Sequence, residues 1–357
     1  MKIRWKKRIA SIILPVMVLM LGGCEMTRGN SNGGNYEENL PGGDSVNQEQ
    51  DDRETAAHLL AMTDMAGGIR VIDLDAEDPA SEKAIVWEWK PDAKQGWKLA
   101  PERVLHSLDD VKLRWSEYYQ KDVVIMTASN NWAGIADYTT GECLWEADVP
   151  YMPHAIEMLP DGDIVIGGSG GNDYMTEGCV MYYDITSGDN CMQTDRQLLS
   201  STHGLAWDPK EGVLWATGWE RLVAYQIKDK KLELVEGKGC KLLHTNGHDL
   251  SMDYYDHDQL FMTVGDKVYK FSKAENKLLI SYNYSDLLLN SVGVKGITSF
   301  ADGTVAYSMA TGVVASYDTD TIYVIRLDEE RGVGVQEKYI MKDFSTYKVK
   351  NFTDGYQ

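Results

Sequence analysis

The stretch His154-Ala-Ile-Glu-Met-Leu-Pro-Asp-Gly162 opens a pattern that is written four times before Thr311. The later copies open at His203, His248 and Lys295, so that successive openings are 49, 45 and 47 positions apart. In each copy a polar residue precedes a short apolar run, and a turn rich in Asp, Gly or Pro leads into a second strand. Several short strands in repeats of this length are typical of a β-propeller, in which each repeat forms one blade.

The sequence before these copies has the same β pattern. Four strand-like runs follow one another between Val111 and Glu146, and three more lie between His58 and Trp89. Between these two groups, residues 91–108 carry Pro, Gly and charge without a period, and we expect them to form a surface insertion. No stretch has the apolar period of a long helix, although short helical turns are expected near Asp286.

The unit that begins at His58 lacks its opening strand, and the C-terminus supplies a candidate. Residues 347–355 match residues 295–303 position by position, and both segments end in Phe-x-Asp-Gly. We therefore expect residues 57–357 to form an all-β, six-bladed β-propeller whose C-terminal strand completes the first blade. A ring closed in this way leaves no sheet edge exposed at the seam.

Residues 1–23 have the pattern of a lipoprotein signal peptide. Basic residues precede the apolar run Ile9–Leu21, which is too short to span a membrane comfortably. The run ends in Leu21-Gly-Gly-Cys24, which resembles the lipobox of bacterial lipoproteins. The resemblance implies that Cys24 is acylated and anchors an exported protein to a bacterial membrane, on its extracytoplasmic side; the alternative is an ordinary secretory signal. Residues 24–56 are polar and rich in Gly and Asn, and we expect them to form a disordered tether.

Charge and cysteine content narrow the range of partners. The formal net charge is −20, from 35 basic and 55 acidic residues, which argues against nucleic acid and against electrostatic docking on anionic lipid. Besides Cys24 the chain has Cys143, Cys179, Cys191 and Cys240, which show neither a CxxC motif nor a zinc-binding spacing. Export permits disulfides, but a core of this size does not need them, so we expect free thiols. We expect a monomer.

The repeats also predict what surrounds the axis of the propeller. The innermost strand of each blade lines the axis, so equivalent positions of these strands meet at one height. The alignment brings together His154, His203, His248, Lys295, Tyr347 and a residue near Asp110. Three neutral imidazoles are suited to one divalent ion, such as Zn, Mn or Ca, with positions left open for a substrate. Glu157 and Asp249 are close in sequence to two of the histidines and are candidates to orient them or to add a ligand. The alternative is a structural ring whose histidines only bond to neighbouring backbone.

Two tryptophans are candidates for ligand stacking. Trp132 and Trp219 lie in loop-like contexts, Asn130-Asn-Trp-Ala-Gly and Thr217-Gly-Trp-Glu, and could form a platform for sugars. The alternative, which we favour, is that they pack between blades, as we expect of Trp207 and Trp215.

The repeat openings carry a family resemblance. Residues 151–166, Thr202-His-Gly-Leu-Ala-Trp-Asp and Gly247-His-Asp-Leu are similar to an uncharacterised family of bacterial exported six-bladed propellers, over roughly residues 57–327. The resemblance implies the fold, and the family brings no established activity. The layout of histidines around an axis also resembles that of oligogalacturonate lyases, which hold a divalent metal there, and of arylsulfotransferases, which use a histidine. Only the layout is shared with these two classes.

Two functions are compatible with the sequence. The first is a binding module that presents one propeller face to a glycan or a partner protein outside the cell. The second is a metal-assisted polysaccharide lyase or hydrolase, in which the three histidines hold the ion and Lys295 or Tyr347 acts as base or anion partner. The acidic composition favours the binding module, because a polyanionic substrate would be repelled unless the axis were locally basic.

Overall fold

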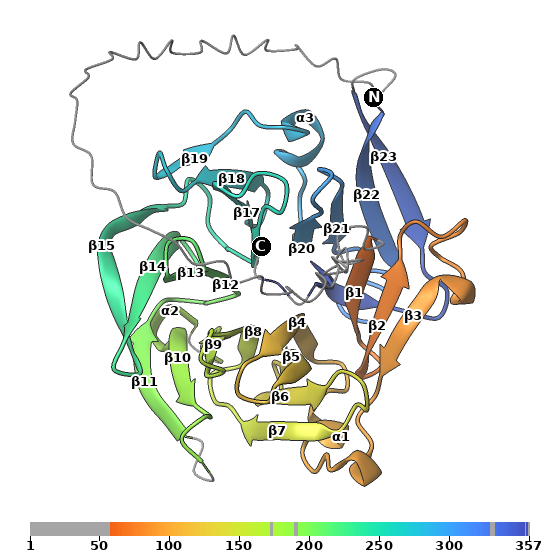
Figure 1. Ribbon diagram of the computed structural model, residues 1–357. Coiled ribbons are helices and arrows are strands. Elements are labelled where there is room, and N and C mark those ends of the chain that lie inside the picture. Colours follow the sequence, from red (N-terminus) through yellow and green to blue (C-terminus); the bar gives the residue numbers. More distant parts are fainter. Residues whose placement is uncertain (1–57, 172–173, 189–191, 329–332, 354, 356–357) are drawn as a thin grey trace, which may run out of the picture. The chain divides into compact units, whose positions relative to one another are not determined.

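The computed structural model describes residues 58–171, 174–188, 192–328, 333–353 and 355. Within these residues, 24 strands form six antiparallel four-stranded sheets arranged around one axis (Figure 1). The chain is therefore a six-bladed β-propeller, as the repeat pattern predicts. The predicted signal peptide, the acylation site Cys24, the tether and Cys191 lie outside the described residues.

Each blade is built from an innermost strand outward, and the blades follow one another along the chain. Blades 1 and 2 contain β24 (Thr346–Asn351), β1 (Leu59–Asp64), β2 (Gly68–Asp73) and β3 (Ile85–Trp89), then β4 (Leu108–Ser116), β5 (Lys121–Ala128), β6 (Trp132–Asp137) and β7 (Cys143–Asp148). Blades 3 and 4 contain β8 (Pro153–Met158), β9 (Ile164–Gly168), β10 (Cys179–Asp184) and β11 (Met192–Leu198), then β12 (Gly204–Asp208), β13 (Val213–Thr217), β14 (Arg221–Lys228) and β15 (Lys231–Lys241). Blades 5 and 6 contain β16 (Asp249–Met252), β17 (Gln259–Thr263), β18 (Val268–Ser272) and β19 (Lys277–Leu279), then β20 (Val294–Ser299), β21 (Val305–Met309), β22 (Thr321–Asp328) and β23 (Val333–Ile340).

Helices are confined to short turns in the connections. These are α1 (Ala100–Arg103), α2 (Tyr174–Glu177) and α3 (Ser285–Leu288), with 3-10 turns at Glu82–Ala84 and Ala93–Gln95. The α3 turn is the one expected near Asp286. In the part of the chain that the structure describes, no helix has the length and apolar character needed to cross a membrane.

The C-terminal strand closes the ring as predicted. Strand β24 pairs antiparallel with β1, with Leu60 opposite Asn351 and Met62 opposite Val349. The sequence match between residues 347–355 and residues 295–303 thus reflects equivalent innermost strands, β24 and β20. Because the first and last strands share one sheet, the seam between the chain ends is held by backbone hydrogen bonds.

Apolar side chains fill the spaces between neighbouring blades. Six clusters of buried residues are present, each made mainly by two adjacent blades. The cluster at the seam joins Leu60 and Met62 of β1 to Ala306 and Val324 of blade 6 and to Val349 of β24. Alternation along each strand produces this arrangement, since both faces of every blade lie against a neighbouring blade.

The prediction of a surface insertion at residues 91–108 is wrong in part. Trp97 is 1% exposed and packs edge-on against Trp89, and its Nε1 donates to the carbonyl of Gly141. Ala100 and Val104 belong to the same core cluster as the strands of blades 1 and 2. The segment lacks a period because it is folded irregularly over the junction, and single apolar residues anchor it there.

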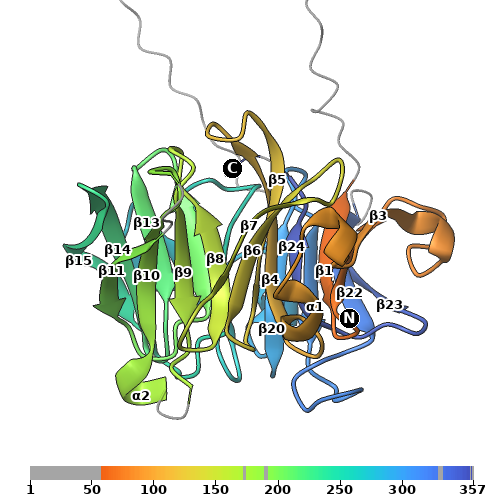
Figure 2. The same ribbon diagram turned by 90° about the horizontal axis from the view of Figure 1, so that it is seen from below.

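All six innermost strands run in the same direction, which defines two faces of the propeller. The residues predicted to line the axis lie at or just before the start of these strands. We call the face at which the innermost strands begin the ring-side face, after the ring of polar side chains described below. The connections into each innermost strand lie on this face, as do the loops between the second and third strands of each blade. The α2 turn, at the lower edge of Figure 2, belongs to this face.

Candidate functional site

The structure places six polar side chains together where the innermost strands begin. We call this set the axial ring: Asp109, His154, His203, His248, Lys295 and Tyr347. The ring centroids of His154 and His203 are 4.2 Å apart, and those of His203 and His248 are 5.3 Å apart. Tyr347 lies edge-on to His154 at 6.2 Å. The member contributed by blade 2 is Asp109, whose Oδ1 lies 3.6 Å from Nε2 of His154.

The backbone enters four of these strands by the same turn. Two residues before the ring member, Met152, Ser201, Asn246 and Gly293 all have a positive φ, between 50° and 75°. Glycine and asparagine adopt this conformation easily, whereas Met152 and Ser201 adopt it at a cost in strain. Strained backbone conformations are concentrated at functional sites. The same positive φ precedes all three histidines, which indicates that the positions of the imidazoles matter for function.

This turn also sets the tautomer of two histidines. Nδ1 of His154 lies 2.8 Å from the carbonyl oxygen of Met152, and Nδ1 of His203 lies 2.9 Å from that of Ser201. A carbonyl oxygen only accepts, so each Nδ1 carries the hydrogen. Nε2 of each neutral ring therefore keeps its lone pair, available to bind a cation or to accept a proton.

Lys295 fixes the third histidine. Its Nζ lies 2.7 Å from Nε2 of His248 and donates to it, while Nδ1 of His248 is buried and makes no hydrogen bond. Burial lowers the pKa of Lys295 to about 8, and the charge of Lys348 adds to the effect. Burial likewise lowers the pKa of His248 well below its ordinary value, helped by Lys295 and Lys348. The site thus holds an ammonium that titrates near neutral pH beside an imidazole that stays neutral.

Burial also shifts the pKa values of three other ring members: His203, Tyr347 and Asp109. Burial lowers the pKa of His203 well below its ordinary value, and the neighbouring His154 and His248 reinforce this. Burial raises the pKa of Tyr347 well above 10, and the carboxylate of Asp109 acts in the same direction. Burial also raises the pKa of Asp109 itself. His154 and Lys295 are partly exposed, so the ring can be reached from solvent at these two positions.

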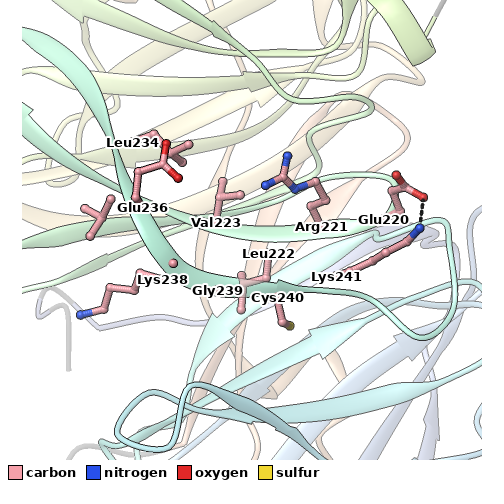
Figure 3. Close-up of a pocket in the computed structure, with 12 residues that line it drawn as sticks. Glu220, Arg221, Leu222, Val223, Leu234, Glu236, Lys238, Gly239, Cys240 and Lys241 are labelled. Carbon is pink, nitrogen blue, oxygen red and sulfur yellow. Dashed lines mark ion pairs between the residues drawn. The ribbon is translucent and has the colours of Figure 1, made fainter.

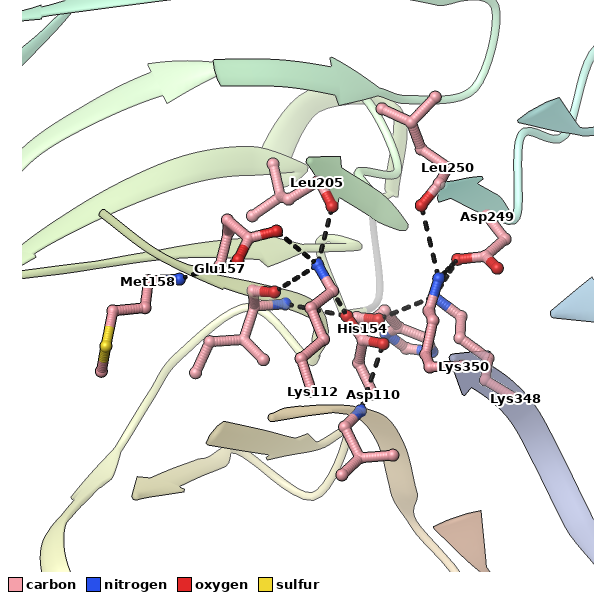
Figure 4. A network of polar contacts seen from close by, with 12 residues as sticks. Asp110, Lys112, His154, Glu157, Met158, Leu205, Asp249, Leu250, Lys348 and Lys350 are labelled. Carbon is pink, nitrogen blue, oxygen red and sulfur yellow. Dashed lines mark hydrogen bonds and ion pairs between the residues drawn. The ribbon is translucent and has the colours of Figure 1, made fainter. Parts of the chain in front are cut away.

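Lys348 is fully buried next to the ring and was not predicted from the sequence. Its Nζ donates to the carbonyl oxygens of His154, at 2.9 Å, and of His203, and lies 3.5 Å from Oδ1 of Asp249 (Figure 4). A single lysine of β24 thus bonds to three blades on the other side of the axis. The sequence feature that could have predicted its role is the alternation of lysine with aromatic or apolar residues in Tyr347-Lys-Val-Lys350. A strand that contacts only an apolar core would not carry lysine at every second position.

The prediction that Glu157 and Asp249 support the histidines is wrong. Glu157 accepts from Lys112 at 3.0 Å and from Nε of Arg114 at 2.8 Å. Asp249 accepts from Nζ of Lys350 at 2.6 Å and from the backbone N–H of Ile297 at 3.0 Å. Burial acts to raise the pKa of Glu157, but Arg114 and Lys112 together hold it below the ordinary value. Both carboxylates point along the axis toward cations, because buried charges require partners more strongly than imidazoles do.

The axis carries more positive than negative groups. Apart from Asp208, which pairs with Lys273 at 2.7 Å, the described charged residues of the innermost strands are five cations and four carboxylates: Lys112, Arg114, Lys295, Lys348 and Lys350, and Asp109, Asp110, Glu157 and Asp249. The raised pKa of Asp109 weakens the negative side, and the lowered pKa values of Lys295 and Lys112 weaken the positive side. The protein as a whole has a net charge of −20, whereas cations and carboxylates are nearly balanced along the axis.

The two tryptophans considered for ligand stacking differ in burial. Trp132 is 0% exposed, packs against Trp97 and donates from Nε1 to Glu146 at 3.2 Å, so it cannot stack on a ligand. Trp219 is half-buried in the ring-side loop between β13 and β14. Trp215 is completely buried and Trp207 nearly so, as expected for residues between blades. The prediction of free thiols is confirmed for Cys143, Cys179 and Cys240.

The depressed histidine pKa values predict how stability depends on pH. In the unfolded chain a histidine takes up a proton near pH 6.5, whereas buried His203 and His248 do so only at lower pH. Their contribution is complete above pH 6.5 and is lost as the pH falls below it, by up to about 1.4 kcal/mol per pH unit for each group. We expect urea unfolding between pH 7.5 and pH 5 to show that the free energy of unfolding falls less steeply with decreasing pH in His203→Gln than in the wild type. The control is His257→Gln, since the His257 side chain is exposed; equal slopes for wild type and His203→Gln would contradict the prediction.

A groove lies far from the axis, between β14 and β15. Its volume is about 390 Å³, and it lies where strand β15 bulges away from β14 between Leu234 and Gly239 (Figure 3). At one end Lys241 pairs with Glu220 at 3.4 Å, and both side chains are exposed. Burial raises the pKa of Cys240 in its wall to about 11, so the thiol is unreactive at neutral pH. Both lysines in the lining of the groove are paired, Lys238 with Glu211 at 2.6 Å and Lys241 with Glu220.

The fold and the axial ring define a class: a six-bladed propeller whose innermost strands present histidine, lysine, tyrosine and aspartate at one end of a charged axis. Within this class, the chain belongs to a family of unknown function (DUF6528), whose model matches residues 70–311. No curated protein matches the sequence. Among solved structures the chain is similar to Kuenenia stuttgartiensis hydrazine synthase, with a TM-score of 0.46 and 11% identity over 66% of this chain and 67% of that one.

Proposed function

We propose that the protein is an exported binding module whose axial ring takes up the anionic group of a ligand, carried by a glycan or a partner protein. The observation that supports this is the contact between Lys295, which is partly exposed, and His248 in the axial ring. A carboxylate that accepts from Lys295 would also approach the buried charge of Lys348. Positive charge focused at one point of an acidic surface attracts small anionic groups and repels cations.

The neutral histidines add a proton-linked component to this binding. Nε2 of His154 and of His203 can accept a proton when a negative charge arrives, since an opposite charge nearby favours the protonated imidazole. The chain enters the propeller at His58, at the start of β1, which lies at the face opposite the axial ring.

The test is titration of small carboxylates into the full-length protein at pH 7. The ligands are acetate and trigalacturonate, and the methyl ester of trigalacturonate is the uncharged control. Binding is measured by calorimetry and by the imidazole proton NMR signals of His203 and His248. Lys295→Met should weaken binding at least about tenfold, and wild-type affinity should fall as the pH rises through about 8, where Lys295 loses its proton. Lys241→Met removes an equal charge from an exposed site and should bind as wild type. Failure of both carboxylates to bind or to shift either imidazole would refute the proposal.

Metal-assisted cleavage of a polysaccharide is the second candidate. One observation favours it: the Nδ1–H groups of His154 and His203 are held by backbone carbonyls, as is common for metal ligands, which leaves Nε2 for an ion. Two others oppose it, because Lys295 already contacts Nε2 of His248 and the charge of Lys348 lies nearby. Among the described residues no group of three or more His, Cys, Asp or Glu has metal-binding geometry. The same calorimetry with Zn²⁺, Mn²⁺ and Ca²⁺ decides between the two candidates: stoichiometric binding that is lost in His203→Ala would favour the enzyme.

A further inference from the structure

Exposed apolar side chains gather on the ring-side face. We call six of them the apolar rim: Met152, Leu243, Val292, Val313, Val314 and Tyr317. Their exposed fractions run from 37% to 69%. The first three belong to connections into innermost strands, two to five residues before a member of the axial ring, and the others belong to the β21–β22 loop.

Contacts place the β21–β22 loop beside the axial ring. Tyr317 packs edge-on against Tyr347 at 5.7 Å, and its hydroxyl donates to the carbonyl of His106 at 3.4 Å. The backbone N–H of Ala310 donates to the carbonyl of Gly293, which joins this loop to the connection that carries Val292. The apolar rim therefore lies next to the axial ring on at least the side of blade 6.

The loop presents its apolar residues in a fixed geometry. The buried carboxylate of Asp318 accepts from the backbone N–H groups of Val313, at 2.8 Å, and of Val314, at 2.9 Å. Asp318 also accepts from the hydroxyl of Ser345. Because these bonds hold the loop backbone, Val313 and Val314 cannot fold back into the core and remain exposed, at 51% and 57%. Exposed apolar residues held in place at a polar site are typical of a protein-binding surface.

We infer that the natural ligand is a segment of a partner protein in which one acidic side chain is flanked by apolar residues. This rests on the proposed binding of an anionic group, and it selects protein over glycan as the ligand. The acidic side chain complements the charges of Lys295, which is partly exposed, and of Lys348 beside it, and the flanking residues cover the apolar rim. Sugars stack on exposed aromatic faces, whereas the rim is aliphatic except for Tyr317, Trp132 is buried and Trp219 is half-buried.

The test begins with a random dodecapeptide library displayed on phage and selected against the immobilised full-length protein. Selected peptides should share one Asp or Glu between Leu, Ile, Val or Phe. A synthetic peptide of the consensus sequence should bind at least about tenfold more weakly to Val314→Asp, Leu243→Asp and Lys295→Met. It should also lose affinity when its own acidic residue is changed to the amide. Leu234→Asp, an equal change at an exposed position of β15, should bind as wild type.

Three outcomes would overturn the inference. The selection could yield no consensus, or a consensus without an acidic residue, or peptides that bind the rim variants as tightly as wild type. Binding of trigalacturonate, or of vesicles of phosphatidylglycerol, that is lost in Val314→Asp would assign the apolar rim to a glycan or a lipid surface instead. Lys295-dependent binding of acetate reports on the axial ring separately, so the inference can fail while the proposed function stands.

Discussion

Removal of residues 344–357 is expected to abolish cooperative folding of the propeller. The deletion takes away β24, which pairs with β1 and packs against β20, and leaves blade 1 without its innermost strand. It also removes Phe344 and Val349 from the seam cluster, together with Lys348 and Lys350, two of the four lysines of the innermost strands. The loss should exceed the whole stability of a typical domain, which is about 5–15 kcal/mol.

Thermal melting by circular dichroism and size-exclusion chromatography report the result. The matched control is a chain that ends at Phe352, which keeps β24 and the buried Phe352 side chain. We expect the control to melt within about 2 °C of the full-length protein, since it loses no strand and no core residue. A cooperative melt of the shorter chain near the wild-type temperature would mean that the ring does not depend on closure by β24.

Substitution of Lys348 by methionine is expected to cost about 3–5 kcal/mol of unfolding free energy. Methionine fills a similar volume but donates no hydrogen bond, so the carbonyls of His154 and His203 lose their donor at the axis. Asp249 also loses a positive charge 3.5 Å away, although Lys350 still pairs with it. A broken buried charge network costs more than a surface ion pair because its remaining members cannot turn to water.

Urea unfolding at pH 7.5 measures this cost. Lys342→Met, at an exposed position six residues earlier in the same tail, should change the free energy of unfolding by less than about 0.5 kcal/mol. If Lys348→Met leaves too little folded protein to measure, Lys350→Met can be measured instead. This variant keeps the bonds of Lys348, so we expect a loss of unfolding free energy between those of Lys342→Met and Lys348→Met. A free energy for Lys348→Met equal to that of Lys342→Met would contradict the assignment of Lys348 as a link between blades across the axis.

The sequence alone determined the number of blades, the closure of the ring and the members of the axial ring from five blades. Each follows from a local repeat: the spacing of His154, His203, His248 and Lys295, and the match of residues 347–355 to residues 295–303. Repeats fix a fold of this kind because each unit buries its faces only against similar neighbours, so that the pattern of one blade dictates the next.

The tertiary structure alone decided the charge of the site and the partners of its members. Lys348 contacts His154 and His203, which are 194 and 145 residues away in sequence. Glu157 pairs with Lys112 and Arg114 of the preceding blade rather than with a histidine. Trp132 looks like a loop residue in sequence, yet it is buried under the irregular insertion that carries Trp97. The pairings across the axis depend on distances between strands, and a sequence repeat does not encode these distances. Burial then determines the partners, because a buried charge is stable only next to an opposite charge or a hydrogen-bonding group.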